Sequence, residues 1–294
     1  IMSMKKLSKK MLAVVAAGAM TMGLAMPAFA ADAGEGTKKV TEAYISKTYN
    51  TEVGKAMQFN FTATQDTAGA DLVQKPVACT IPSISFTENE TGTTKKVSEA
   101  IKFAPFNEAG KYEYTVKETT SEPAITDSKL EKLIMSKAEY KMTVYVVEDP
   151  ENNFKVDQIV VNKTKNDKGT DEGGKVDISG DKTKNTFNFV NTYVQEAGTG
   201  PDPSKPDPTY NDNGALKVSK TIAAPEGSID SSATFNFTAT FAFPEGTDAN
   251  TLGGVKGNEA DVSLTDGTCT FSLKHGQNMK FTGLPVGTKI TVTE

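Results

Sequence analysis

The sequence has little of the side-chain chemistry from which most catalytic and metal sites are built. Its 294 residues include one histidine, His275, two cysteines and no tryptophan. A hydrolytic triad or a zinc site needs histidine or several cysteines. No GxSxG, HExxH, CxxC or phosphate-loop pattern is present either. We therefore expect a protein that is not an enzyme and that holds no metal and no cofactor.

The two cysteines are also too few and too distant for a disulfide framework. Cys79 and Cys269 lie far apart in the chain, whereas disulfide-stabilised exported domains have several closely spaced cysteines. We expect two isolated, partly buried thiols. If the protein is exported, its folded state then needs a source of stability other than disulfide bonds.

Long apolar runs are absent except at the N-terminus. Lysines in residues 5–10 precede an apolar stretch at 11–26, and residues 27–30, Pro-Ala-Phe-Ala, follow the small-x-small cleavage pattern. The stretch is short for a membrane span. We predict a signal peptide at 1–30, a flexible leader at 31–37 and a secreted mature protein without a membrane segment.

The charge balance argues against nucleic acid as a partner. The formal net charge is −5, and removal of the four signal lysines leaves 28 basic against 37 acidic side chains, or −9. Nucleic-acid binding depends on basic patches that neutralise phosphates. The mature chain has no basic stripe, so we expect a soluble, acidic exported body.

From about residue 38 the pattern is typical of an all-β protein. Short alternating runs rich in Thr, Val, Tyr and Phe are separated by Gly, Pro, Asn and Asp, which predicts Ig-like β-sandwiches. One stretch, 127–137, carries Leu130, Leu133 and Ile134 at helical spacing. We expect a short helical crossover there.

Two halves of the chain repeat each other across a segment rich in Pro, Asp and Gly, 196–213. The hexapeptide at 59–64, Phe-Asn-Phe-Thr-Ala-Thr, recurs unchanged at 235–240. A Ser-Lys-Thr motif precedes each copy, and a Thr-Val-x-Glu motif follows each. We predict two related β-sandwich domains, 38–195 and 214–294, joined by an extended, semi-rigid linker.

Strand parity places three polar residues on the apolar faces of their strands. Alternate residues of a strand share a face, so Lys47 lies with Ile45 and Tyr49. By the same rule Glu118 lies with Tyr112, Tyr114 and Val116, and Asn191 lies with Phe187 and Phe189. Lys220 and Glu294 repeat the first two positions, and the spacing is 71 residues in one copy and 74 in the other.

Each residue alone has a plain explanation. A lysine can reach solvent from a strand end, a glutamate can lie at a rim, and an asparagine can close a turn. The combination, and its recurrence in register, favours one shared buried site.

Burial dictates the chemistry of such a site. An unpaired ammonium or carboxylate in an apolar interior costs several kcal/mol, so the pKa of each group shifts toward neutrality. A neutral amine is a nucleophile. Lys47 could then attack the side-chain carbonyl of Asn191, with Glu118 as acid and base, and release ammonia. The product is an amide cross-link that reduction cannot break.

These motifs resemble the streptococcal-type pilin isopeptide linkage domains of Gram-positive shaft pilins, over about residues 38–195. The resemblance rests on the motifs around Lys47, Phe59, Glu118 and Asn191. It implies a Lys47–Asn191 bond with Glu118 catalytic. Residues 214–294 are similar to Cna-B-type surface modules, chiefly through Phe-Thr-Gly-Leu-Pro-Val-Gly-Thr at 281–288.

In the second module the resemblance matches Lys220, as the isopeptide lysine, and Glu294, as the catalytic acid. The asparagine-bearing last strand and an LPxTG-like sorting motif are not in the sequence. We therefore expect this module, and the sequence, to be truncated at the C-terminus.

The resemblance also implies partners. Shaft pilins are polymerised by a sortase through a surface lysine, and Lys163, Lys182 and Lys184 are candidates, although each is more simply a solvated lysine. We expect a cell-wall protein that contacts sortase and other pilin subunits as a pilus shaft. The alternative is an adhesin that presents loops of the same stalk domains to a host surface or matrix.

Overall fold

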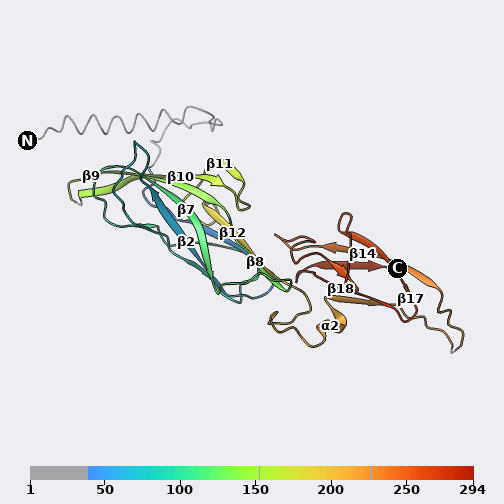
Figure 1. Ribbon diagram of the computed structural model, residues 1–294. Coiled ribbons are helices and arrows are strands. Elements are labelled where there is room, and N and C mark those ends of the chain that lie inside the picture. The colour runs from blue at the N-terminus through green and yellow to red at the C-terminus, as the bar shows by residue number, and fades with distance from the viewer. Residues whose placement is uncertain (1–38, 152, 226) are drawn as a thin grey trace, which may run out of the picture.

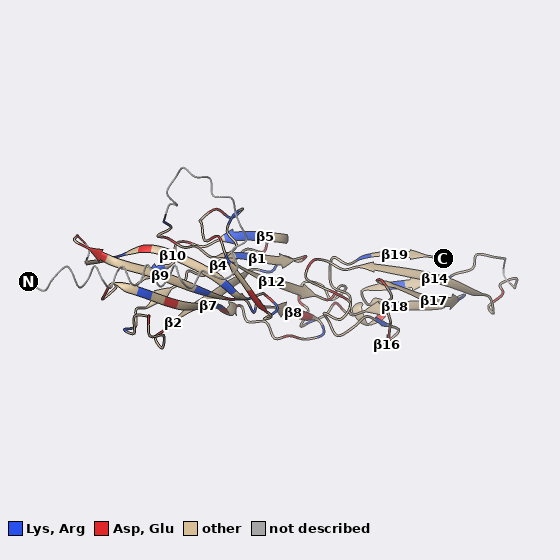
Figure 2. Ribbon diagram, turned by 90° about the horizontal axis from the view of Figure 1, so that it is seen from above, with Lys and Arg blue, Asp and Glu red and all other residues tan. Residues whose placement is uncertain are grey.

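The computed structural model describes residues 39–151, 153–225 and 227–294. The predicted signal peptide and leader lie outside these ranges. The described chain is almost entirely β-structure, as the sequence predicts, and forms two β-rich units that follow one another along the long axis (Figure 1). Figure 2 shows the same end-to-end arrangement from above.

The first unit comprises strands β1 to β12 and packs two sheets face to face. The smaller sheet has the order β5-β1-β12-β8 and the larger has the order β11-β10-β9-β7-β2-β4. The smaller sheet contains β1 (Ser46–Thr51), β5 (Gly92–Val97), β8 (Glu131–Ile134) and β12 (Asn188–Gln195). The larger contains β2 (Met57–Asp66), β4 (Ile84–Phe86), β7 (Gly110–Glu122), β9 (Glu139–Asp149), β10 (Asn153–Lys165) and β11 (Asp171–Lys175). A separate short pair is formed by β3 (Cys79–Thr80) and β6 (Lys102–Phe103).

Aromatic side chains from both sheets fill the space between them. Phe61 of β2 meets Phe189 of β12 with ring centroids 5.0 Å apart, and Tyr140 of β9 meets Phe187 at 4.8 Å. Such tilted and edge-on aromatic pairs add to the stabilisation from burial alone. The core of the sandwich therefore lies directly under β1 and β12.

The first and last strands of this unit are neighbours and run parallel. Ser46 to Thr51 of β1 pair with Asn188 to Tyr193 of β12, while the other side of β1 pairs antiparallel with β5. The three strands lie side by side in Figure 2. Parallel neighbours need a long connection, and here the rest of the unit supplies it.

The predicted helical crossover at 127–137 is wrong. Residues Glu131–Ile134 form strand β8, which pairs antiparallel with Thr192 to Gln195 of β12. The helical spacing of Leu130, Leu133 and Ile134 is only a weak local preference for a helix. Hydrogen bonds to β12 outweigh it, so residues 131–134 form an edge strand instead. Leu133 is the member of this run that reaches the core, at 7% exposed.

The segment after β12 is also more ordered than an extended spacer. The Asp207 N–H donates to the Thr199 carbonyl at 2.9 Å, which folds the chain back on itself. The carboxylates of Asp202 and Asp207 accept hydrogen bonds from residues two positions ahead. Asp favours turns by this mechanism. The many Asp and Pro residues of this segment therefore produce turns instead of an extended chain.

The two units meet through a β-bridge. Glu196, directly after β12, pairs with Pro285, and its buried carboxylate accepts the main-chain N–H of Gly283. Burial, and after it the nearby Glu196 carboxylate, raise the pKa of Tyr210 in helix α2 (Tyr210–Asn213). A buried carboxylate needs a partner such as the Gly283 N–H, and this contact ties the second unit to the end of β12.

The second unit comprises strands β13 to β19 in two smaller sheets. One has the order β13-β18-β15-β16 and the other has the order β17-β14-β19. Phe281 of the first sheet packs against Phe241 and Phe271 of the second, at 5.3 and 5.6 Å. The strands are β13 (Leu216–Ser219), β14 (Thr234–Ala242), β15 (Lys256–Gly257), β16 (Ala260–Asp261), β17 (Thr268–Lys274), β18 (Asn278–Thr282) and β19 (Lys289–Thr293). Among the described strands β13 pairs with β18 alone, whereas β1 has neighbours on both sides.

The cysteines behave as the sequence predicts. Cys79 and Cys269 are both free, the first partly buried and the second buried. Burial raises the pKa of both thiols, to about 12 for Cys79. Over the part of the chain that the structure describes, no helix is long and apolar enough to cross a membrane.

Candidate functional site

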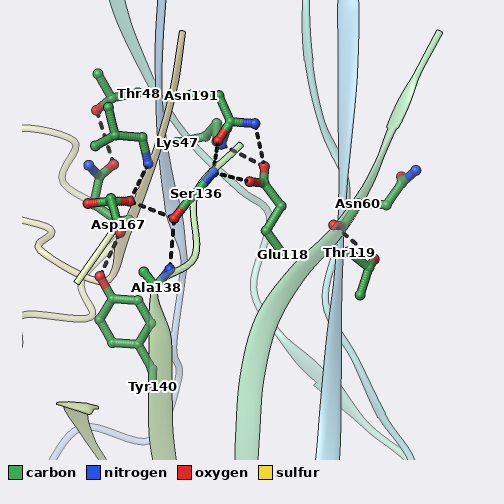
Figure 3. Close-up of polar contacts among 12 residues, drawn as sticks. Lys47, Thr48, Asn60, Glu118, Thr119, Ser136, Ala138, Tyr140, Asp167 and Asn191 are labelled. Carbon is green, nitrogen blue, oxygen red and sulfur yellow. Dashed lines mark hydrogen bonds and ion pairs between the residues drawn. The ribbon is translucent and has the colours of Figure 1, made fainter. Parts of the chain in front are cut away.

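A lysine on β1 is completely enclosed in the first unit. Lys47 is 0% exposed, and its Nζ lies 4.4 Å from the ring centroid of Phe59. The same Nζ lies 2.6 Å from Glu118 Oε1 (Figure 3). Strand parity turns Lys47 inward because its neighbours Ser46 and Thr48 occupy the other face of β1. The amine is therefore held between an aromatic face and a carboxylate, with no access to water.

Glu118 reaches the lysine from the opposite sheet. Its side chain is 0% exposed, and a β-bulge follows it directly in β7. Asn60 of β2 pairs with Thr120 while Phe61 pairs with Glu118, so Thr119 is the extra residue. The Thr119 hydroxyl donates to the Asn60 carbonyl at 3.2 Å (Figure 3). Bulges often aim a side chain next to a functional site, and this one sets where Glu118 leaves its strand.

Asn191 completes the cluster from β12. It is 0% exposed, its Nδ2 donates to Glu118 Oε1 at 3.0 Å, and its Oδ1 accepts the Ser136 main-chain N–H at 2.6 Å. Since β1 and β12 are parallel neighbours and Asn191 is the register partner of Tyr49, Asn191 and Lys47 lie on the same inward face. The structure thus brings together the three residues that parity singled out, and one oxygen of Glu118 touches both nitrogens.

Burial moves both ionisable groups toward their neutral forms. It lowers the pKa of Lys47 to about 8, although the nearby Glu118 carboxylate favours the ammonium. It also raises the pKa of Glu118, against the opposing effect of Lys47, Asn191 and the Ser136 N–H. Desolvation is the largest cause in each case. A proton shared over 2.6 Å can therefore pass to the carboxylate and leave a neutral amine beside a carboxamide.

The cluster of Lys47, Glu118 and Asn191 lies in a part of the chain that matches a known protein family. Residues 35–194 match the family model described as the Spy0128-like isopeptide containing domain. The chain belongs to this isopeptide-domain family. The resemblance of the first unit to pilin isopeptide domains is thereby confirmed. Residues 214–294 match a second model, described as a domain of unknown function, so the similarity to Cna-B modules stays a prediction.

Solved structures of Streptococcus pyogenes major pilins are similar to the chain in part. One major pilin has 20% sequence identity and a TM-score of 0.38, with 86% of this chain and 82% of that one covered. A single-residue variant of a major pilin has 22% identity and a TM-score of 0.37, covering 85% and 81%. The major pilin of serotype GAS13637 has 17% identity and a TM-score of 0.36, covering 86% and 82%. No curated protein matches the chain.

Two residues that the sequence analysis missed hold the cluster of Lys47, Glu118 and Asn191 in place. Ser136 lies in the turn after β8, and its hydroxyl donates to Asp167 Oδ1 at 2.6 Å (Figure 3). The same Asp167 oxygen accepts the main-chain N–H of Val190, the residue before Asn191, at 2.8 Å. Ser136 fell within the stretch predicted as a helix, and Asp167 lies in an ordinary polar turn, so no local pattern singled out either residue.

A third missed residue did leave a signal. Phe59 opens the repeated hexapeptide, and its ring faces the Lys47 amine. In the second copy Lys220 Nζ lies 3.9 Å from the ring centroid of Phe235, which opens the same hexapeptide. The repeat could have indicated that each lysine rests on the first aromatic of this motif.

The matching pair of the second unit is much more open. Lys220 Nζ lies 2.8 Å from Glu294 Oε1, as the spacing predicts, but the two side chains are 17% and 47% exposed. Water reaches this pair because β13 lacks a second neighbour in the described chain. The two groups therefore meet without the desolvation that acts on Lys47 and Glu118.

The candidate sortase lysines lie at the surface of the isopeptide domain. Lys182 and Lys184 are exposed, the latter 3.7 Å from Asp181. Lys163 is more enclosed, at 21% exposed, and pairs with Glu172 at 3.2 Å. In the described residues no three His, Cys, Asp or Glu side chains gather as a metal site would require.

Proposed function

We propose that the chain is a structural protein of the Gram-positive cell surface, a pilus shaft subunit whose first unit cross-links itself. The observation that carries the proposal is the buried cluster in which Glu118 Oε1 contacts Lys47 Nζ at 2.6 Å and Asn191 Nδ2 at 3.0 Å. Membership of the isopeptide-domain family supports it. Other pilin subunits and a sortase are the partners that this role requires.

The reaction follows from the positions of the three groups. Glu118 takes a proton from the Lys47 ammonium, and the neutral amine attacks the side-chain carbonyl carbon of Asn191. A C–N bond forms to Lys47 Nζ, and the bond to Asn191 Nδ2 breaks. The same Glu118 oxygen can return its proton to the leaving nitrogen, so ammonia departs. Glu118 then takes the second proton, which the lysine nitrogen loses as it becomes an amide, and no oxidant is needed. Folding supplies the proximity, and each molecule reacts once.

The mass of the protein tests this reaction. The mature chain, residues 31–294, is expected to weigh one ammonia less than its sequence. A proteolytic digest should yield one branched peptide that joins Lys47 to Asn191. Glu118→Ala and Asn191→Ala should each restore the full mass. An unmodified mass for the wild-type chain would contradict the proposal.

The rate of bond formation is expected to pass through a plateau and to fall at both acid and alkaline pH. The reactive pair, a neutral Lys47 with a protonated Glu118, holds one proton, as does the ion pair from which it arises. In acid the pair holds two protons and the amine stays charged. Because burial raises the pKa of Glu118, this decline begins at a higher pH than for an ordinary carboxyl group.

The alkaline decline is expected above about 8, where Lys47 loses its proton while Glu118 is ionised. No acid is then left to protonate the leaving nitrogen. Intact mass after timed refolding at a series of pH values measures the profile. A rate that continues to rise well above the pKa of Lys47 would show that amine deprotonation alone limits the reaction.

A further inference from the structure

The turn between β8 and β9 presents one main-chain N–H to the carboxamide of Asn191. The Ser136 N–H points at Asn191 Oδ1 with a donor–acceptor distance of 2.6 Å, and both residues are buried (Figure 3). When an amine adds to the carboxamide carbon, this oxygen acquires the negative charge. A fixed N–H at that position stabilises the charge as it develops.

The same N–H has a second acceptor whose charge changes in the reaction. Glu118 Oε2 lies 3.1 Å from the Ser136 nitrogen. Before the reaction, an ionised Glu118 competes with Asn191 Oδ1 for this donor. Once Glu118 has taken the lysine proton its pull on the N–H weakens, just as the Asn191 oxygen becomes an anion. The hydrogen bond to Asn191 is therefore stronger in the transition state than in the ground state, which is the condition for catalysis.

Asp167 fixes both partners of this hydrogen bond. Its Oδ1 accepts the Ser136 hydroxyl at 2.6 Å and the Val190 N–H at 2.8 Å, and its main-chain carbonyl accepts the Lys137 N–H at 2.9 Å. The hydroxyl oxygen of Ser136 in turn accepts a hydrogen bond from the Ala138 N–H at 3.1 Å. One carboxylate thus ties the turn that carries the donor to the strand that carries the acceptor.

The location of Asp167 explains why a side chain is needed there. Strand β8 pairs with β12 only from Thr192 onward, so the Val190 N–H lies beyond the end of β8. Asp167, between β10 and β11, takes the place of a strand neighbour at this point. The Asn191 side chain is thus held where β12 pairs with β1 on one side but has no strand neighbour on the β8 side.

We propose that the Ser136 main-chain N–H is the oxyanion donor for cross-link formation and that Asp167 is the positioning residue that aims it. This inference rests on the proposed Lys47–Asn191 reaction. The Ser136 side chain acts through its hydrogen bond to Asp167, while the catalytic contact comes from the backbone.

Timed loss of ammonia in the full mature chain tests the assignment. A short pulse of cell-free synthesis is followed by a chase, with samples quenched in denaturing acid and resolved by intact mass. Ser136→Pro, which removes the N–H, is expected to slow the reaction by about 100- to 1,000-fold, the usual effect of deleting one oxyanion donor. Ser136→Ala and Asp167→Asn should slow it by about 10-fold, because the donor remains but is less well held.

Matched variants separate positioning from folding. Ser136→Thr keeps the hydroxyl and should restore the wild-type rate. Asp181 is an exposed turn carboxylate that accepts hydrogen bonds from the N–H and the hydroxyl of Thr183, and Asp181→Asn should leave the rate unchanged. In a Lys47→Ala chain, which cannot react, the ¹³C shift of the Asn191 side-chain carbonyl should move with Ser136→Ala and Asp167→Asn and return with Ser136→Thr. A purely structural role would lower stability without this spectroscopic pattern.

The outcomes distinguish this inference from the function on which it rests. If the wild-type chain never loses ammonia, the cross-linking reaction and the oxyanion assignment are both overturned. If the wild-type chain reacts and Ser136→Ala, Asp167→Asn and Ser136→Pro all react at its rate, the oxyanion assignment alone is wrong. Should Ser136→Pro fail to fold, the rates and carbonyl shifts of the two milder variants decide the question.

Discussion

Replacement of Glu118 by glutamine is expected to slow cross-linking by at least about 100-fold while the first unit still folds. General acid–base groups contribute about 100- to 10,000-fold to such reactions. Glutamine keeps the size and hydrogen-bonding capacity of the side chain, but it cannot take the Lys47 proton or return one to the Asn191 nitrogen. The measurement is the fraction of chains that retain the full mass over time, with circular dichroism as the check on folding.

Glu113→Gln is the matched control for this variant. Glu113 lies on the same strand, is also buried, and pairs with Lys141 at 2.8 Å rather than with Lys47. The control should cross-link at the wild-type rate. Equal rates for Glu118→Gln and Glu113→Gln would remove Glu118 from the reaction and require another proton acceptor.

Replacement of Asn191 by alanine is expected to cause the largest loss of stability. The bond would close a loop from residue 47 to residue 191, and chain-entropy models give about 5 kcal/mol for a cross-link of this span. For a domain of this size that corresponds to a fall in Tm of about 10–20 °C. Denaturant and thermal unfolding, each followed by circular dichroism, measure the change.

Two comparisons isolate the contribution of the bond. Asn188→Ala, on the same strand, removes only the hydrogen bonds that Asn188 Oδ1 accepts from Ser46 and Thr48, so it should cost about 1 kcal/mol. Glu118→Gln leaves Asn191 in place but blocks the reaction, so it should unfold nearly as easily as Asn191→Ala. A Glu118→Gln chain as stable as the wild type would mean that the bond adds nothing to stability.

Strand parity could predict the three central residues because each depends on which face it occupies. Lys47, Glu118 and Asn191 all share a face with large apolar neighbours, and the structure places them in contact. The chemical roles assigned to them remain predictions until the mass is measured. The fold class was predictable for the same reason, since period-two patterns dominate the sequence.

The supporting residues could not be found in this way. The roles of Ser136 and Asp167 depend on a main-chain N–H and on a turn whose partners are distant in sequence. Residues 127–137 were wrongly expected to be helical because local spacing cannot register the pairing of β8 with β12. A pattern of alternation also cannot tell whether a face is covered. Lys220 and Glu294 follow the same rule as the first pair, yet they remain accessible to water.

The parallel pairing of β1 with β12 has a mechanical consequence. The chain enters β1 at its N-terminal end and leaves β12 at its C-terminal end, where Glu196 bridges to the second unit. A pull between the start of the first unit and the second unit drags these neighbouring strands in opposite directions along their length. The six partnered positions from Ser46 to Thr51 are then sheared together instead of being opened one by one. The unit would resist extension even before Lys47 reacts, and the amide bond would take up the force only after this clamp begins to slip.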